Sequence, residues 1–369
     1  MTIIFNNIYS GKRVLITGHT GFKGAWLTCW LLKMNALVSG LSIGIPTQPS
    51  MFEELGLEKR IDHHICDVRN LDEVQSLIAK LNPEFIFHLA AQPLVSVSFS
   101  DPLDTITTNV VGTSIILEAL RNINHDCVAI IITSDKCYEN LEWVWGYKES
   151  DPMGGNDIYS ASKGAAEIIF KAYYHAFFNK PEARVKLATA RAGNVIGGGD
   201  WAKDRIVADC MRSWSSGDSV EIRRPASTRP WQHVLEPLSG YLLLGIALYE
   251  GRELTGESFN FGPKSEQNKT VLELLHDLSG FWSFVSTNEA YRVSDESTYH
   301  EAGLLKLNCD KALFFLKWQG NLEYFECVRM VSEWYKKFYS GGENMYRLTI
   351  DQIAEYEKLG LERGLSWSR

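Results

Sequence analysis

The chain has 369 residues, of which 45% are hydrophobic and 22% are charged. This is enough apolar material for a sizeable core and excludes a disordered or collagen-like chain, while the length suggests two domains or one fold with an elaborated lobe. The 37 Lys and Arg against 45 Asp and Glu give a formal net charge of −8. Because a nucleic-acid-binding protein is expected to carry the opposite sign, we expect no nucleic-acid partner.

The cysteines and the lack of long apolar segments indicate a soluble cytoplasmic protein. The 7 cysteines are scattered, without a CxxC pair or a zinc spacing, so we expect free thiols in a reducing compartment and no metal site. The N-terminal residues lack the basic start and the apolar core of a signal peptide. The longest uncharged stretch, residues 34–52, contains Pro46 and Pro49, so we expect no membrane span.

Short apolar strands alternate with helical patterns through the first half of the chain. In chain order the pattern predicts a strand over 13–17, a helix over 25–34, a strand over 36–43, a helix over 72–81, a strand over 85–89, a helix over 101–121, a strand over 128–133, a helix over 159–178 and a strand over 185–190. Such alternation is typical of a parallel sheet covered on both faces. We therefore predict an α/β fold with a Rossmann-like, doubly wound parallel sheet.

The alternation ends after Arg191, where a loop-rich region begins. A helix over 237–249 and a strand over 257–261 follow, and we expect this pair to return to the sheet. Residues 1–192 and about 233–262 would then form the Rossmann domain. Residues from about 193 to 232 and from 263 to 369 would form a smaller, mixed α/β C-terminal lobe.

A glycine-rich turn, Gly18-His-Thr-Gly21-Phe22-Lys23-Gly24, lies between the first predicted strand and helix. Glycines there permit a tight turn and a close backbone approach to a pyrophosphate, which the helix N-terminus then faces. The alternative is a turn that only links the two elements. The second predicted strand ends without an acidic residue for a ribose and without a nearby arginine for a 2′-phosphate. We therefore expect NAD rather than NADP, bound loosely.

Tyr159 and Lys163 are four residues apart at the start of a predicted helix and so share one helical face. A lysine ammonium beside a tyrosine stabilises the phenolate and is expected to lower the pKa of the hydroxyl. Ser134 ends the preceding strand. Together the three residues suit proton transfer coupled to hydride transfer at a carbinol carbon, whereas the alternative is a surface ion–dipole pair.

These motifs resemble those of the extended short-chain dehydrogenase/reductases that act on sugar nucleotides. The resemblance covers nearly the whole chain and rests on six strings, at 18–24, 88–92, 108–113, 159–164, 191–197 and 229–234. A seventh string, Thr133-Ser-Asp-Lys-Cys-Tyr-Glu139, is similar to that of the CDP-glucose 4,6-dehydratases. The resemblance implies that NAD contacts residues from several strand ends: Gly18, Gly21, Phe22, Lys23, Gly24, Asp67, Val68, Leu89, Ala90, Ala91, Gln92, Asn109, Thr133, Tyr159 and Lys163.

The same resemblance implies an internal oxidation, elimination and reduction of CDP-glucose. Tyr159 would take the proton of the C4 hydroxyl, Asp135 would protonate the departing C6 hydroxyl and Lys136 would remove the C5 proton. For Lys136 the alternative is a cation that orients Asp135 or stabilises the enolate. The product would be CDP-4-keto-6-deoxyglucose, for deoxysugar and O-antigen or other polysaccharide biosynthesis. Two further alternatives are another nucleotide-sugar dehydratase or 4-epimerase, and a non-catalytic NAD-sensing protein.

Substrate and partner contacts follow from the resemblance in the same way. Ser134, Asn194, Arg205 and Arg229 would contact the sugar nucleotide, because arginines pair well with phosphates. Arg223 and Arg224 add positive charge nearby, although each arginine taken singly is more typical of a solvated surface. The helices over 101–121 and 159–178 carry apolar stripes, and relatives pair through them, so we expect a homodimer.

Overall fold

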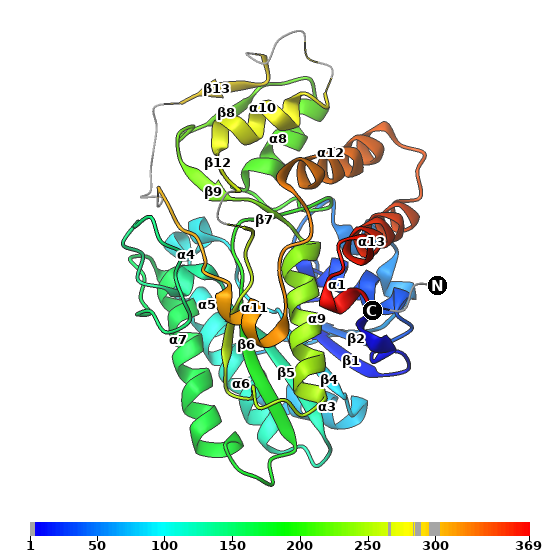
Figure 1. Ribbon diagram of the computed structural model, residues 1–369, viewed down its shortest axis with the longest axis vertical. Coiled ribbons are helices and arrows are strands. Elements are labelled where there is room, and N and C mark those ends of the chain that lie inside the picture. Colours follow the sequence, from blue (N-terminus) through cyan, green and yellow to red (C-terminus); the bar gives the residue numbers. More distant parts are fainter. Residues whose placement is uncertain (1–3, 265–266, 283, 285–288, 295–302) are drawn as a thin grey trace.

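The computed structural model describes residues 4–264, 267–282, 284, 289–294 and 303–369. Its centre is a seven-stranded sheet in the order β11-β6-β5-β4-β1-β2-β3, and every neighbouring pair is parallel (Figure 1). The strands are β1 (Arg13–Thr17), β2 (Leu37–Ser42), β3 (Asp62–Ile65), β4 (Phe85–His88), β5 (Cys127–Ile132), β6 (Val185–Arg191) and β11 (Ser258–Asn260). This order confirms the predicted Rossmann-like, doubly wound fold.

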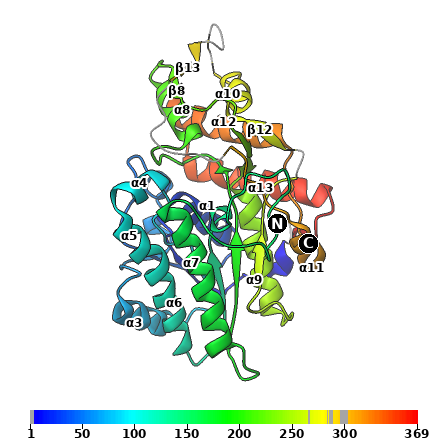
Figure 2. The same ribbon diagram turned by 90° about the vertical axis from the view of Figure 1, so that its left-hand side faces the viewer.

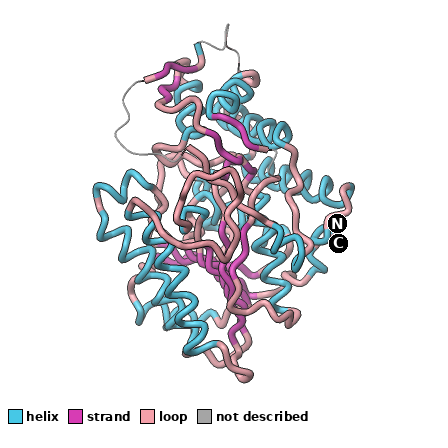
Figure 3. Tube along the Cα trace, turned by 60° about the vertical axis from the view of Figure 1, so that its left-hand side comes forward, coloured by secondary structure: helices cyan, strands magenta, loops and turns pink. Residues whose placement is uncertain are grey.

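The two faces of the sheet have separate cores, because successive side chains of a strand point to opposite sides. On one face Val14 and Ile16 pack with the tryptophans of α1 and with α9. On the other face Leu15 packs with Ile116 and Leu117. Figures 2 and 3 show helices on both sides of the strands. The helices are α1 (Phe22–Lys33) and α9 (Leu235–Tyr249) on the first face and α3 (Leu71–Leu81), α6 (Gly112–Arg121) and α7 (Ile158–Tyr173) on the second.

Three elements differ from the expectation. The sequence Asp-His-His-Ile of β3 gives no apolar signal, because this strand is the edge of the sheet and is only partly buried. The predicted helix over 101–121 is instead α5 (Pro102–Ile106), a π-helical turn (Thr107–Val111) and α6, and α4 (Val95–Ser100) precedes it. The predicted helix over 159–178 is α7 followed by a second π-helical turn, Tyr174–Phe178.

The smaller lobe lies beyond the carboxyl ends of the strands (Figure 1). It contains α8 (Ile206–Ser215), α10 (Val271–Ser279), α12 (Tyr324–Ser340) and two strand pairs, β8 (Val220–Ile222) with β13 (Tyr291–Val293) and β9 (Thr228–Pro230) with β12 (Asn268–Thr270). A third pair, β7 (Val195–Ile196) with β10 (Gln232–His233), joins the lobe to the sheet. Short helices complete the chain: α2 (Met51–Glu54), α11 (Asp310–Leu316) and 3-10 turns at Phe5–Asn7, Leu57–Lys59, Asp135–Cys137 and Ser366–Ser368.

The C-terminal segment contacts the Rossmann domain in two places. α11 packs against α9 and β11, and α13 (Met345–Glu362) packs against α1. Trp30 and Lys33 of α1 both donate hydrogen bonds to the Glu357 carboxylate, at 2.9 and 2.5 Å. In the described part of the chain no helix is long and apolar enough to cross a membrane.

Candidate active site

The candidate residues meet at the carboxyl ends of β1, β4 and β5. Gly18 follows β1, Leu89 follows β4 and Ser134 follows β5. The strand order reverses between β1 and β4, since β2 and β3 continue on one side and β5, β6 and β11 on the other. Open α/β sheets bind their ligands at such a reversal, so this edge is the candidate site.

The glycine-rich turn holds the backbone of two strand ends close together. Gly18 has φ +75°, and a Cβ placed there would lie 2.7 Å from the backbone N of Ala90. A side chain is therefore excluded both by conformation and by space. α1 begins directly after Gly21, which caps it without a side-chain hydrogen bond, and its first turn has no acidic residue. The N–H groups of that turn remain available to an anion, which fits the pyrophosphate of a dinucleotide.

Ser134 and Asp135 form a hydrogen-bonded pair at the end of β5. The Ser134 hydroxyl donates to Asp135 Oδ1 at 2.8 Å and accepts from the backbone N–H of Lys136 at 3.3 Å. These bonds begin the short 3-10 turn Asp135–Cys137. The Asp135 side chain is buried, while Lys136 is only partly buried. The two neighbours that the sequence assigns to acid and base therefore lie in different surroundings.

Tyr159 and Lys163 lie on the first turns of α7, which the Asp157 side chain caps by accepting from the N–H of Ser160 at 2.8 Å. Both side chains are buried, and Lys163 Nζ lies 5.9 Å from the Tyr159 ring centroid. Burial raises the pKa of Tyr159 to about 12, against the hydrogen bond with Ser134, and burial lowers the pKa of Lys163 to about 8. The pKa of Tyr159 is therefore raised and not lowered as expected, because burial outweighs the hydrogen bond with Ser134 and the charge of Arg205.

A buried ion pair behind these residues was not predicted. The Arg191 guanidinium binds the Glu167 carboxylate through Nε at 2.8 Å and Nη2 at 2.9 Å, and both side chains are fully buried. Thr133 and Thr189 also donate to Glu167, at 2.5 and 2.8 Å. The pair thus ties α7 to β5 and β6. The available signal was the position of Glu167, four residues after Lys163 on the same helical face.

Lys23 and Arg205 bring positive charge to the same place. Burial lowers the pKa of Lys23 to about 8, and the charges of Arg205 and Lys163 act in the same direction. Arg205 pairs with Asp200 at 2.7 Å, and its charge reaches Tyr159. The site therefore gathers three cations, Lys23, Lys163 and Arg205, around Tyr159 and Asp135.

The other predicted arginines make contacts within the smaller lobe. Arg229 donates to the carbonyls of Thr228 and Gly303, at 2.8 and 3.2 Å, and Arg223 lies 3.6 Å from Asp204. Arg205, a member of the predicted arginine cluster, acts electrostatically on Tyr159 and Lys23.

Several predicted cofactor residues are fixed by protein contacts. Asn109, in the first π-helical turn, bonds the backbone of Gln92 in both directions, at 2.9 and 3.1 Å, and donates to Ser162 at 2.9 Å. Asp67 accepts hydrogen bonds from Nε and Nη2 of the Arg69 side chain, which holds the pKa of Asp67 below its usual value. The contact of Asp67 with Arg69 holds the loop that contains Val68. The contact of Asn109 with Gln92 holds the loop that contains Leu89, Ala90 and Ala91.

Three further side chains of types that often serve in binding or catalysis are His88, Trp143 and Trp145. His88 is buried and bonds Thr17 at 2.7 Å and Thr113 at 3.3 Å, so its ring nitrogens are used within the core. Trp143 stacks on Tyr147, while Trp145 is 69% exposed. Among the described residues, no group of His, Cys, Asp or Glu is arranged to hold a metal ion.

Comparisons with known proteins agree with this architecture. Residues 15–181 match the family model described as GDP-mannose 4,6 dehydratase. The chain is 44% identical over 357 residues to a CDP-glucose 4,6-dehydratase of Salmonella typhimurium, which covers 96% of this chain and 98% of the relative.

Two solved structures are similar in fold at lower identity. One is the epimerase Mth375 of Methanothermobacter thermautotrophicus, with a TM-score of 0.77, 21% identity and coverage of 90% of this chain and 95% of the other. The second is the dTDP-glucose 4,6-dehydratase DesIV of Streptomyces venezuelae, crystallised with NAD and TYD, with a TM-score of 0.75, 19% identity and coverage of 90% and 99%. Through its full-length similarity to the Salmonella enzyme, the chain belongs to the CDP-glucose 4,6-dehydratase family of sugar-nucleotide dehydratases.

Proposed function

We propose that the protein is an NAD-dependent hydro-lyase that converts CDP-glucose into CDP-4-keto-6-deoxyglucose and water, for deoxysugar biosynthesis. The observation that carries this proposal is the pairing of Ser134 with a buried Asp135 beside Tyr159, in a chain 44% identical to a CDP-glucose 4,6-dehydratase. An epimerase needs only the transfer at C4. An elimination needs further acid–base groups, which Asp135 and Lys136 supply.

The residues around the glycine-rich turn fit NAD. Gly18, Gly21 and the start of α1, which has no side-chain cap, would hold the pyrophosphate, and Asp67 beside Val68 would accept a hydrogen bond from the adenine amino group. When bound there, NAD would supply the hydride acceptor for C4 and the hydride donor for C6. The remaining cofactor contacts proposed are those of the strand ends: Phe22, Lys23, Gly24, Leu89, Ala90, Ala91, Gln92, Asn109, Thr133, Tyr159 and Lys163.

Tyr159 serves as the base for the C4 hydroxyl. Its pKa of about 12 in the protein means that the neutral phenol is favoured, so the proton must leave as the hydride does. Ser134 bonds the Tyr159 hydroxyl, and Lys163, one turn along α7, is the nearby cation that stabilises the phenolate. Oxidation at C4 produces a ketone, which makes the C5 proton acidic.

Asp135 and Lys136 perform the elimination. Asp135 gives a proton to the departing C6 hydroxyl, so that water leaves as the C5–H electron pair forms the double bond. Lys136, as the neutral amine, takes the C5 proton and becomes the ammonium, which then stabilises the enolate. Reprotonation at C5 and hydride addition at C6 then complete the product. Ser134, Asn194, Arg205 and Arg229 are the proposed contacts of the sugar nucleotide.

The test offers CDP-, dTDP-, UDP- and GDP-glucose, each with deuterium at C4, to the purified protein with NAD. A CDP-glucose 4,6-dehydratase moves the label from C4 to C6 of the CDP-sugar and releases water. A 4-epimerase leaves the label at C4, and a non-catalytic NAD sensor leaves all four sugars unchanged. Either of those results contradicts the proposal, and preference for another base contradicts the assignment of the substrate.

We also propose a cytoplasmic homodimer that forms through the surface of α5, α6 and α7. Part of the predicted stripe, including Ile116 and Leu117, is used in the chain's own core. Other apolar side chains on this surface are exposed, namely Leu103, Ile106, Val111, Ile168 and Phe177. Static light scattering at micromolar concentration should give twice the chain mass, and Ile168→Glu should shift it toward the monomer. A monomeric wild-type protein would contradict the dimer.

A further inference from the structure

The wall behind the Asp135 carboxylate is the backbone of Gly193, two residues after the end of β6. A Cβ placed on Gly193 would lie 1.8 Å from Asp135 Oδ2 and 2.2 Å from Asp135 Cγ. The φ of Gly193 is outside the left-handed region, so the backbone itself accepts any residue. What excludes a side chain at 193 is therefore the position of Asp135 and not the conformation of the chain.

The side chain of Gln232, on β10, holds this wall in place. Its Nε2 donates to the carbonyl of Gly193 at 3.0 Å and to the carbonyl of Phe261 at 3.1 Å. The backbone N–H of Gln232 donates to the carbonyl of Asn194 at 3.3 Å. Gln232 thus joins the end of β6 to the segment after β11, and it is buried.

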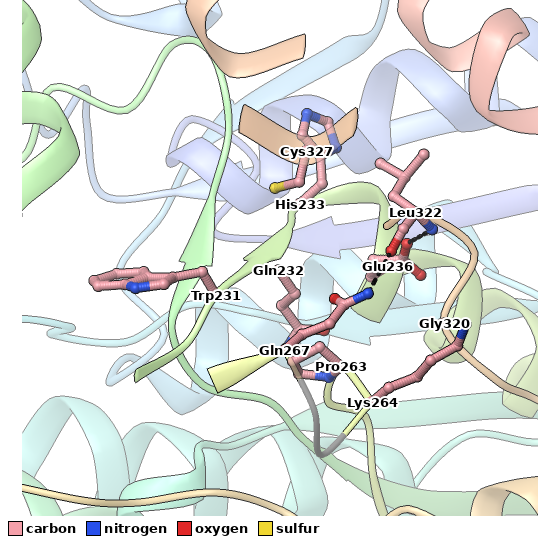
Figure 4. A pocket seen from close by; sticks show the side chains of 10 residues that line it. All are labelled: Trp231, Gln232, His233, Glu236, Pro263, Lys264, Gln267, Gly320, Leu322 and Cys327. Carbon is pink, nitrogen blue, oxygen red and sulfur yellow. Dashed lines mark hydrogen bonds between the residues drawn. The ribbon is translucent and has the colours of Figure 1, made fainter. Parts of the chain in front are cut away.

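Gln232 also borders a small cavity. Gln232 lines a cavity of about 10 Å³, shared with His233 and Glu236, which has room for one water molecule (Figure 4). Within the described residues Gln232 Oε1 has no protein partner. The amide thus donates to two carbonyls and accepts nothing from the described residues, so Gly193 and Phe261 set its orientation.

We propose that Gly193 and Gln232 are positioning residues that fix the Asp135 carboxylate for the elimination step. Gly193 sets how far the carboxylate can retreat from the Ser134 hydroxyl, and Gln232 keeps Gly193 at that distance. The inference rests on the proposed function, because it assigns Asp135 to proton transfer at C6. Oxidation at C4 uses Tyr159 and Lys163 instead, so a shift of Asp135 slows elimination more than oxidation.

The experiment is a single turnover of CDP-glucose by the holoenzyme with Gly193→Ala, Gln232→Met and the wild-type chain. The absorbance of the reduced nicotinamide rises with oxidation at C4 and falls when the hydride reaches C6. Gly193→Ala should leave the rise within about threefold of wild type and slow the fall by about 10²-fold, the scale of one general acid. Gln232→Met should slow the fall in absorbance by about tenfold. The variant removes the hydrogen bond to the carbonyl of Gly193 but adds no atom against Asp135.

A substrate with fluorine in place of the C6 hydroxyl separates positioning from a general structural defect. Elimination then releases fluoride, which needs less help from an acid than hydroxide does. Both variants should recover toward the wild-type rate with this substrate, whereas a disturbed fold would slow both substrates alike. Gly262→Ala is the matched control, because a Cβ there meets Leu307 at an ordinary 3.4 Å.

The outcomes separate the inference from the proposed function. If the wild-type chain does not convert CDP-glucose, the proposed function and this inference fail together. If the wild-type chain is active and both variants slow oxidation and elimination equally, or slow neither, the positioning role alone is overturned. If Gly193→Ala does not fold, Gln232→Met with the two substrates decides the question by the same criterion.

Discussion

Two buried carboxylates, Glu167 and Asp135, flank the end of β5 and have opposite surroundings. Glu167 accepts hydrogen bonds from Thr133, Thr189, Ser258 and twice from Arg191. Within the described residues Asp135 accepts one, from Ser134. Although burial favours the protonated form of Glu167, the Arg191 charge and these bonds hold the pKa of Glu167 below its usual value.

This difference indicates a structural role for Glu167 and a chemical role for Asp135. A buried charge is tolerated when its lone pairs are used, and Glu167 meets this condition by joining α7, β5, β6 and β11. Asp135 is buried with most of its hydrogen-bonding capacity unused by the chain, which leaves it able to exchange a proton with a substrate. Thr133 and Ser134 are adjacent, so the rigid network around Glu167 also fixes the strand end that presents Asp135.

Asp135→Asn should have the largest effect, and on activity alone. The amide keeps the shape and can still accept from Ser134, but it cannot transfer a proton, so turnover of CDP-glucose should fall about 10²–10⁴-fold. The free energy of unfolding should change by less than about 1 kcal/mol, since only one protein hydrogen bond is involved. Steady-state kinetics and urea denaturation measure the two quantities. Full activity in this variant would remove Asp135 from the mechanism.

Arg191→Met should, in contrast, mainly lower the free energy of unfolding. It leaves the Glu167 carboxylate buried without its partner, which costs about 3–5 kcal/mol of unfolding free energy. The double variant Glu167→Met with Arg191→Met should recover part of that loss, because both charges are removed together. Urea denaturation of the two single variants and the double variant gives the coupling. Additive losses would show that the pair is not a closed unit.

Lys163→Met should change how stability depends on pH. The pKa of Lys163 is lowered from 10.5 to about 8, mainly by burial. Between these values the unfolded chain binds a proton that the folded chain does not, so stability rises with pH through this window. The penalty is fully present below pH 8 and is on the order of 3 kcal/mol.

The variant lacks this contribution, so its stability should gain less between pH 8 and pH 10 than that of the wild type. Lys23, whose pKa is also about 8, keeps part of the rise in both proteins. Lys171→Met, on an exposed position of α7, is the matched control and should keep the wild-type slope. Equal slopes in wild type and Lys163→Met would mean that burial does not lower the lysine pKa.

The sequence was sufficient to predict those parts of the fold and of the site that depend on a local pattern, such as one strand end or one helix turn. The order of strands and helices, the turn at Gly18 and the face shared by Tyr159 and Lys163 are local patterns of this kind. The sequence pattern did not predict β3, because an edge strand buries little apolar area. It did not predict the π-helical turns either, because their residues have ordinary helical periodicity.

The rest of the site depends on contacts across the chain. Gln232 bonds a carbonyl 39 residues earlier, and no local pattern places Gly193 against Asp135. The pKa of Tyr159 was expected to be lowered, whereas burial, which the sequence does not quantify, raises it. In both cases the sequence identified the functional residue, Asp135 or Tyr159, but tertiary packing determines its surroundings.

Ser258→Ala should have the smallest effect and tests how redundant the network around Glu167 is. The Ser258 hydroxyl donates to Glu167 at 3.2 Å, the longest of the donors, and four other bonds remain when it is lost. The unfolding free energy should fall by about 1 kcal/mol and turnover should stay at the wild-type rate. Ser134→Ala removes the single donor of Asp135 and the hydrogen bond with Tyr159, so it should lower turnover while costing similar stability. If the two serine variants lose equal activity, Glu167 and Asp135 do not differ in function. Loss of a donor to Glu167 would then disturb the chemistry as much as loss of the donor to Asp135.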